Sequence, residues 1–187
     1  MDDRKSEVIG PYTLVALPHQ GGFHGVIWQG GKKTEAVTGS SVDDCLNQLR
    51  DRVADLLQAE AAARGDSSPT VSATVAAIHR VAPRLTTGQM QMLRAHYNAP
   101  DRCITATQLA EAADYRGYQA ANLQYGRVGL LLYGELPVVL PRRASDGKLI
   151  FTCALAEATD QRSDDETQWI WRMRPHVAEA LAAAKLV

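Results

Sequence analysis

The pattern of apolar and polar positions along the first third of the chain predicts an antiparallel sheet. Short apolar runs bounded by turn residues predict strands over Tyr12–Leu17, Phe23–Gln29 and Lys33–Thr38. Gly30 and Gly31 fit a tight hairpin turn between the last two strands, because glycine adopts positive φ at little cost.

A helix is predicted after the third strand. Ser40 or Ser41 suits its N-cap, and Asp44 adds an acidic residue to its first turn. Apolar residues then recur every three or four positions, at Val42, Cys45, Leu46, Leu49, Val53, Leu56 and Leu57. One stripe of the helix is therefore expected to pack on the sheet, which gives a β-β-β-α domain over residues 1–66.

A break in the pattern separates this domain from the rest of the chain. The segment Arg64–Thr70 combines Gly, Ser and Pro, which end one helix and start another. An Ala/Val-rich stretch over Thr70–Val81 then predicts a short helix that ends before Pro83. We expect residues 67–84 to form a linker helix and residues 85–187 a second domain, so that the predicted fold class is α+β.

The second domain begins with two predicted helices. Thr86 or Thr87 caps the first helix, which ends before Pro100. Thr105 caps the second helix, and Gln108 three positions later completes a capping box. The apolar residues expected on these two helices are Met90, Leu93 and Tyr97 on the first, and Leu109, Ala110 and Ala113 on the second.

The spacing that follows is typical of a helix-turn-helix motif. Ala110 is the small residue over which the next helix crosses, and Asp114 is the turn residue in a position that favours left-handed φ. Tyr115, Ala120 and Leu123 occupy the three apolar positions beyond the turn. Ala120 and Leu123 are therefore expected to face inward, which leaves the polar residues between them on the outer side.

A hairpin and a last helix complete the second domain. Strands are predicted over Leu149–Ala156 and Gln168–Arg174, joined by a polar tip over Glu157–Thr167. Proline at the first helical position starts the final helix at Pro175. Trp169, Trp171 and Met173 alternate with Ile170, Arg172 and Arg174, and we interpret the two tryptophans as core or edge packing residues rather than base-stacking platforms. Gly126, Gly129 and Gly134 are likewise interpreted as helix-packing positions.

This order of elements resembles the winged helix-turn-helix domains of MarR-type regulators and of the DNA-reading modules attached to restriction nucleases. The resemblance covers about 100 residues and implies DNA binding through the second helix of the motif, near residues 118–133, often as a homodimer. The candidate DNA contacts are Arg116, Tyr118, Gln119, Asn122, Gln124, Arg127, Arg142 and Arg143. One departure opposes phosphate binding, because the predicted wing tip is acidic, with Asp160, Asp164, Asp165 and Glu166 against Arg162.

The first domain is similar in topology to antitoxin domains of the HicB type and, more distantly, to double-stranded-RNA-binding folds. That similarity covers about 55 residues and implies a partner-binding or inhibitory module. A protein-interaction function, as an antitoxin or a phage-defence or counter-defence component, is therefore the alternative to a DNA-binding regulator or defence-system reader.

Composition narrows these alternatives only in part. The formal net charge of −1 over 187 residues means that any nucleic-acid surface must be a local basic patch. The five histidines are scattered without metal-ligand spacing, the three cysteines are far apart, and no nucleophile has a base beside it. We expect no metal, no cofactor and no catalysis. We expect neither a membrane span nor a secretory signal, and therefore a cytoplasmic location.

Overall fold

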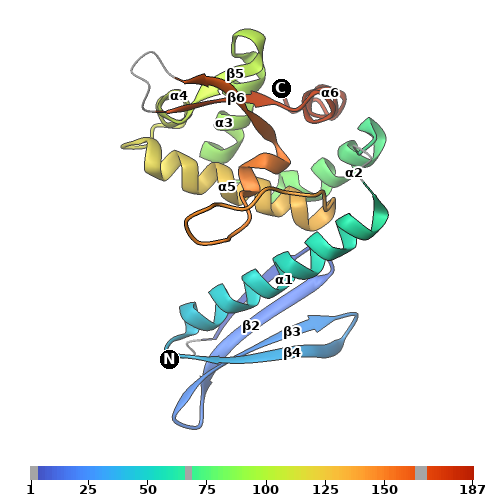
Figure 1. Cartoon of the computed structure of the whole chain (residues 1–187), viewed down its shortest axis with the longest axis vertical. Helices are drawn as coiled ribbons and strands as arrows, with labels where there is room; N and C mark the ends of the chain where they lie inside the picture. Colours follow the sequence, from blue (N-terminus) through green and yellow to red (C-terminus); the bar gives the residue numbers. More distant parts are fainter. Residues whose placement is uncertain (1–3, 66–68, 163–167) are drawn as a thin grey trace. The chain divides into compact units, whose positions relative to one another are not determined.

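The computed structural model describes residues 4–65, 69–162 and 168–187 (Figure 1). The described chain is a mixed α+β protein with six α-helices and two sheets, one of four strands and one of three. It divides into two compact units, Met1–Asp66 and Ser67–Val187, which we call unit 1 and unit 2. In the described residues, no helix combines the length and the apolar character needed to cross a membrane.

Unit 1 contains an antiparallel sheet whose strands follow one another in chain order. The strands are β1 (Lys5–Ile9), β2 (Tyr12–His19), β3 (Gly22–Gln29) and β4 (Lys32–Gly39). The three predicted strands are present, and Gly30 and Gly31 turn the β3–β4 hairpin with φ of 56° and 78°. Strand β1 was not predicted, because only Val8 and Ile9 are apolar in it.

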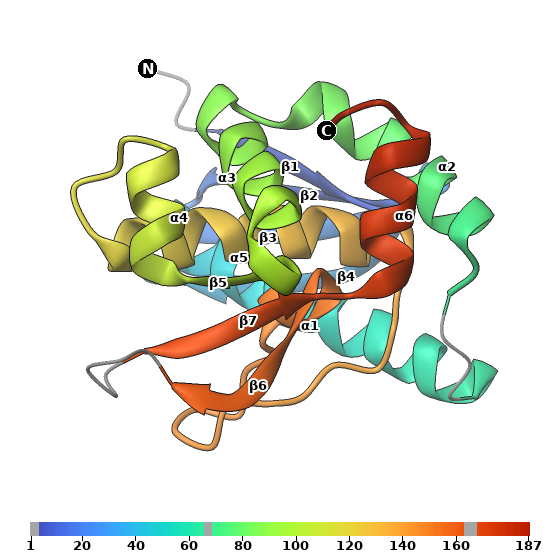
Figure 2. The same cartoon turned by 90° about the horizontal axis from the view of Figure 1, so that it is seen from above.

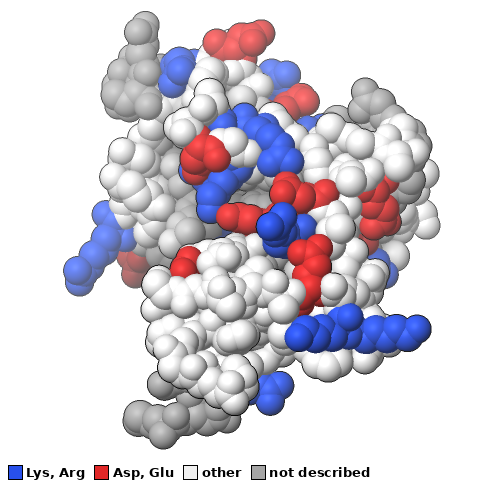
Figure 3. All heavy atoms as spheres, turned by 60° about the horizontal axis from the view of Figure 1, so that its bottom comes forward, with Lys and Arg blue, Asp and Glu red and all other residues white. Residues whose placement is uncertain are grey.

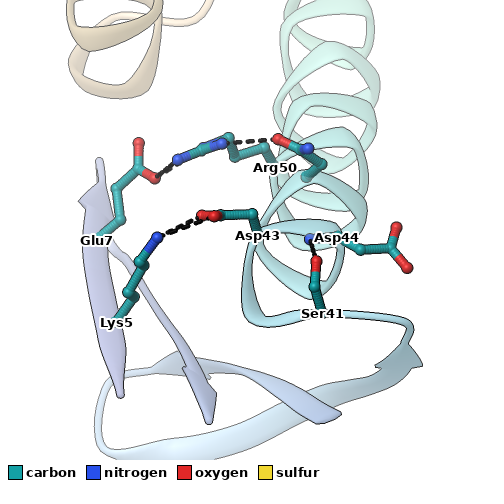
Figure 4. A network of polar contacts seen from close by, with 7 residues as sticks. Lys5, Glu7, Ser41, Asp43, Asp44 and Arg50 are labelled. Carbon is teal, nitrogen blue, oxygen red and sulfur yellow. Dashed lines mark hydrogen bonds and ion pairs between the residues drawn. The ribbon is translucent and has the colours of Figure 1, made fainter. Parts of the chain in front are cut away.

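Polar contacts with α1 (Val42–Arg64) help to hold the edge strand β1 in place (Figure 4). Lys5 Nζ donates to both carboxylate oxygens of Asp43, at 2.7 and 2.9 Å. Arg50 Nε donates to Glu7 at 2.7 Å. These contacts join residues about 40 positions apart in the sequence, so the local pattern of β1 carries no sign of them.

Helix α1 begins as expected and covers one face of the sheet. The hydroxyl of Ser41 accepts from the backbone N–H of Asp44 at 3.0 Å, which caps the helix. Leu14 of β2 and Ile27 of β3 are opposite one another in the register and fully buried on the covered face. The predicted apolar stripe of α1 is buried except for Leu56, which is exposed.

Unit 2 contains the remaining five helices around one apolar core. They are α2 (Val71–Val81), α3 (Thr87–Asn98), α4 (Ala106–Ala112), α5 (Tyr118–Glu135) and α6 (Pro175–Ala183). Short 3₁₀ turns follow α2 and α3, at Ala82–Arg84 and Pro100–Arg102. Helix α2, which we expected as a linker, buries Ala77 and Ile78 in the core of unit 2.

The second sheet has the strand order β5-β7-β6 and is antiparallel throughout. Its strands are β5 (Cys103–Thr105), β6 (Ala156–Arg162) and β7 (Trp169–Met173). Strands β6 and β7 form a hairpin, and β7 also pairs with β5 (Figure 2). The residues 163–167 at its tip, with Asp164, Asp165 and Glu166, lie outside the described residues.

The strand predicted over Leu149–Ala156 is wrong, because a 3₁₀ turn, η3 (Phe151–Ala154), replaces it. The segment has strand-like apolar composition, but its backbone packs against α5. At Gly129 an added Cβ would lie 2.0 Å from the carbonyl oxygen of Phe151. Only glycine permits this approach, so a long-range contact overrides the local preference.

Candidate nucleic-acid interface

Helix α4 begins at the capping box expected from the sequence. The Thr105 hydroxyl accepts from the backbone N–H of Gln108 at 3.3 Å, and Gln108 Oε1 accepts from the N–H of Thr105 at 2.8 Å. Leu109, Ala110 and Ala113 are buried, as expected. The start and the inward face of the first helix of the motif are thereby fixed by residues close together in the sequence.

The turn after α4 has the backbone geometry that the spacing predicts. Asp114 adopts φ of +55°, in the left-handed region. The N–H of Tyr115 then donates to the carbonyl of Ala110 at 2.9 Å, and the N–H of Asp114 to that of Glu111 at 3.3 Å. This pair of bonds is a Schellman motif, which ends α4 and turns the chain toward α5.

The residues on the inward face of α5 differ from the predicted ones. Ala121 and Tyr125 are buried, whereas Ala120 is half-buried and Leu123 is 58% exposed. The expectation that Ala120 and Leu123 face inward is therefore wrong. The first helical residue is Tyr118, after an N-cap at Gly117, so three residues separate α5 from the turn residue Asp114. Neighbouring positions on a helix are about 100° apart, so the buried face at Ala121 and Tyr125 is a different face from that of Ala120 and Leu123.

The start of α5 still presents polar side chains to solvent. Gln119 and Asn122 are exposed, Tyr118 is 44% exposed, and Arg116 is exposed in the turn before them. Arg127 is exposed two turns beyond Gln119. Five of the eight candidate contacts therefore lie on the outer surface of α5 or directly before it.

Gln124 is directed instead toward α3. Its Oε1 accepts from Nε2 of Gln89 at 3.1 Å, and Gln89 is buried. Gln89 also accepts from the N–H of Thr86, in the capping box of α3. Gln124 therefore has an internal structural contact, which a helix-turn-helix spacing alone does not show.

Arg142 and Arg143 lie in the loop between α5 and η3, and both form contacts within that loop. Arg142 pairs with Leu149 in an isolated antiparallel bridge, and its Nη1 donates to the carbonyl of Gly147 at 2.9 Å. Arg143 forms an ion pair with Asp146 at 3.1 Å, although both side chains remain partly exposed. These two arginines stabilise their own loop, and a phosphate would have to compete with Asp146 for Arg143.

The hairpin carries an exposed aromatic residue beside a cation. The guanidinium of Arg162 lies 3.5 Å from the ring centroid of Trp169, which is 45% exposed. Trp171 is partly buried and packs against the core of unit 2. Of the two tryptophans expected to pack, only Trp171 therefore belongs to the core. Asp160, on the same strand as Arg162, is exposed.

A buried polar cluster connects α5 to α3 and β7. His96 of α3 is fully buried, and its Nε2 lies 2.9 Å from the carbonyl oxygen of Trp171 and 3.0 Å from that of Arg102. Carbonyls only accept, so Nε2 carries the proton, and Nδ1 accepts from the Tyr125 hydroxyl at 2.6 Å. This histidine thereby joins α3 and α5 to β7.

Burial determines the charge state of this cluster. Loss of solvation lowers the pKa of His96 to about 4, although the two carbonyls oppose the shift. Burial also raises the pKa of the Tyr125 hydroxyl. His96 was not predicted as a core residue, but it belongs to a stripe with Gln89, Met92 and Leu93 whose three- and four-residue spacing is visible in the sequence.

Charges of both signs are mixed on one face of the chain. The face of the chain drawn in Figure 3 shows Lys and Arg side chains interspersed with Asp and Glu. No group of three or more His, Cys, Asp or Glu side chains suited to a metal ion is found among the described residues. Cys45, Cys103 and Cys153 are free thiols, the first and last of them buried.

Comparison with known proteins adds no relative. Neither protein-family models, curated proteins nor solved structures give a match to this chain. The features that bear on function are therefore the geometry of unit 2 and the exposed residues of α5.

Proposed function

We propose that unit 2 is a winged helix-turn-helix domain that binds double-stranded DNA, with the start of α5 in the major groove. The observation that supports this most is the exposure of Gln119 and Asn122 directly after the turn at Asp114. Glutamine and asparagine can each bond two adjacent groups on the major-groove edge of adenine. The hairpin β6–β7 after α5 occupies the place of a wing in the chain order.

Arginines beside these amides supply charge for the DNA backbone. Arg116 precedes α5 and Arg127 lies on it, and both are exposed. In the described structure no side chain caps α5 at Gly117, so the first N–H groups of the helix can also face a phosphate. With a net charge of −1 on the whole chain, such a local group suits sequence-selective binding better than a general affinity for DNA.

Replacing Gln119 and Asn122 by alanine is expected to lower specific DNA affinity, by about 1–3 kcal/mol for each good base contact that is lost. Both side chains are exposed, so the fold should be unaffected. The measurement is a fluorescence titration at two salt concentrations, with duplexes that the unmodified protein has selected from a random-sequence pool.

Gln91→Ala is the matched control, because Gln91 is an exposed amide on α3 in the same unit. It should bind the selected duplexes like the unmodified chain. An equal loss on selected and on random duplexes would make Gln119 and Asn122 non-specific contacts. No binding by the unmodified chain, even at low salt, would contradict DNA binding altogether.

Unit 1 favours a second candidate function, binding of a protein partner. Val8, Thr13 and Trp28 are neighbours across β1, β2 and β3, on the sheet face opposite the one that α1 covers. Val8 is 45% and Trp28 is 40% exposed. A protein partner could bury these two apolar side chains together with Thr13 between them, which suits the inhibitor or antitoxin role suggested by the topology.

If unit 1 binds a protein, the complex should survive nuclease treatment, and its formation should depend on Trp28. Chain purified from its host after nuclease treatment should retain a protein in fixed proportion, and Trp28→Ser should release it. Leu56→Ser, at an exposed residue of α1, is the control that should retain it. A protein retained equally by both variants would not be bound through this face.

A further inference from the structure

Leu123 is the most exposed large apolar side chain in the described part of the chain, at 58%. It lies on α5, where the sequence spacing had placed it in the core. Burying a leucine side chain is worth about 1.5–3 kcal/mol, and the buried stripe of α5 passes through Ala121 and Tyr125 instead. Leu123 therefore contributes no core packing to unit 2.

The neighbours of Leu123 are the residues proposed to contact DNA. Gln119, Leu123 and Arg127 are four residues apart in turn, so they follow one line along the outer face of α5. Asn122 is adjacent to Leu123 and is also exposed. An apolar side chain thus lies between an amide and a guanidinium, on the face with which the helix would enter the groove.

We propose that Leu123 contacts the 5-methyl group of a pyrimidine, in thymine or in 5-methylcytosine. This inference rests on the proposed function and assigns part of its specificity. The 5-methyl group is the apolar feature that base pairs present in the major groove, and apolar side chains read it by contact. One helical turn advances about 5.4 Å and base pairs are about 3.4 Å apart, so Gln119 and Leu123 reach base pairs one or two steps apart.

The test compares DNA with and without that methyl group. Duplexes selected by the unmodified chain from a random pool are made again in two forms, one with uracil in place of thymine and one with 5-methylcytosine in place of cytosine. Uracil keeps the hydrogen-bonding groups of thymine and lacks only the methyl. Removal of one contacted methyl should weaken binding about fourfold, and addition of one should strengthen it about fourfold.

Leu123→Ala should remove this response to the methyl group, whereas Val139→Ala, at an exposed apolar residue outside α5, should keep it. A response to uracil identifies thymine as the source of the methyl group, and a response to the modified cytosine identifies 5-methylcytosine.

Two results overturn the inference and are distinguishable from one another. Binding that ignores methyl content, or a response that Leu123→Ala preserves, would refute the role of Leu123 and leave DNA binding intact. No binding of the unmodified chain to any duplex at low salt would refute the proposed function and this inference together.

Discussion

Gly129→Ala is expected to destabilise unit 2 by at least about 2 kcal/mol, although alanine is the better helix former. The new Cβ would lie 2.0 Å from the carbonyl oxygen and 2.6 Å from the carbonyl carbon of Phe151. Both are backbone atoms, so no side-chain rotation relieves the overlap. Either η3 moves away from α5 or the helix shifts, and both changes open a buried contact.

The same helix offers a matched control for this substitution. At Gly126 an added Cβ meets only the Thr152 hydroxyl, at 3.9 Å, which is an ordinary contact. Gly126→Ala should therefore stabilise the protein by about 0.5–1 kcal/mol. Urea unfolding monitored by circular dichroism compares the two variants. Equal stability of Gly129→Ala and the unmodified chain would show that η3 does not pack on α5 as described.

Mild acid is expected to lower the free energy of unfolding of the protein, because His96 is buried in its neutral form. Its pKa is about 4 in the folded protein, against an ordinary value of 6.5. Between these values the unfolded chain binds a proton that the folded chain does not, so stability is present above about pH 6.5 and is lost as the pH falls toward 4. The expected loss is about 2 kcal/mol between about pH 7.5 and about pH 5, where few carboxylates yet titrate.

A substitution separates the contribution of His96 to the pH dependence of stability from the contributions of other titrating groups. His96→Gln should be less stable than the unmodified chain at neutral pH, because the hydroxyl of Tyr125 and two carbonyls lose their partner. The deficit should shrink as the pH falls. His176, whose pKa burial also lowers, acts in the same direction and remains in both proteins. An equal pH slope in the two proteins would contradict the assignment to His96.

Local chemistry made much of unit 2 predictable. The caps at Thr86 and Thr105, the left-handed turn at Asp114 and the proline start of α6 all involve residues within a few positions of one another. Each is decided by hydrogen bonds or backbone preferences of the same short segment. The sequence carries those signals without help from the rest of the fold.

Features that depend on contacts between distant residues were not predicted from the sequence. Strand β1 depends on partners in α1, and η3 depends on the missing Cβ of Gly129. The inward face of α5 follows Ala121 and Tyr125, which pack in the core of unit 2, rather than Ala120 and Leu123 as the spacing predicts. The candidate site was affected most, because this shift exposes Leu123 and the contact with Gln89 draws Gln124 inward.

DNA binding at the exposed start of α5 is the contact on which the proposed function of unit 2 depends most. The direct measurement is nuclear magnetic resonance of the ¹⁵N-labelled chain, with a duplex selected from a random pool added stepwise. If DNA binds there, the largest shift changes will fall on backbone amides from Arg116 to Arg127, with little change in the sheet of unit 1. Shift changes confined to that sheet, or none at all at low salt, would contradict it.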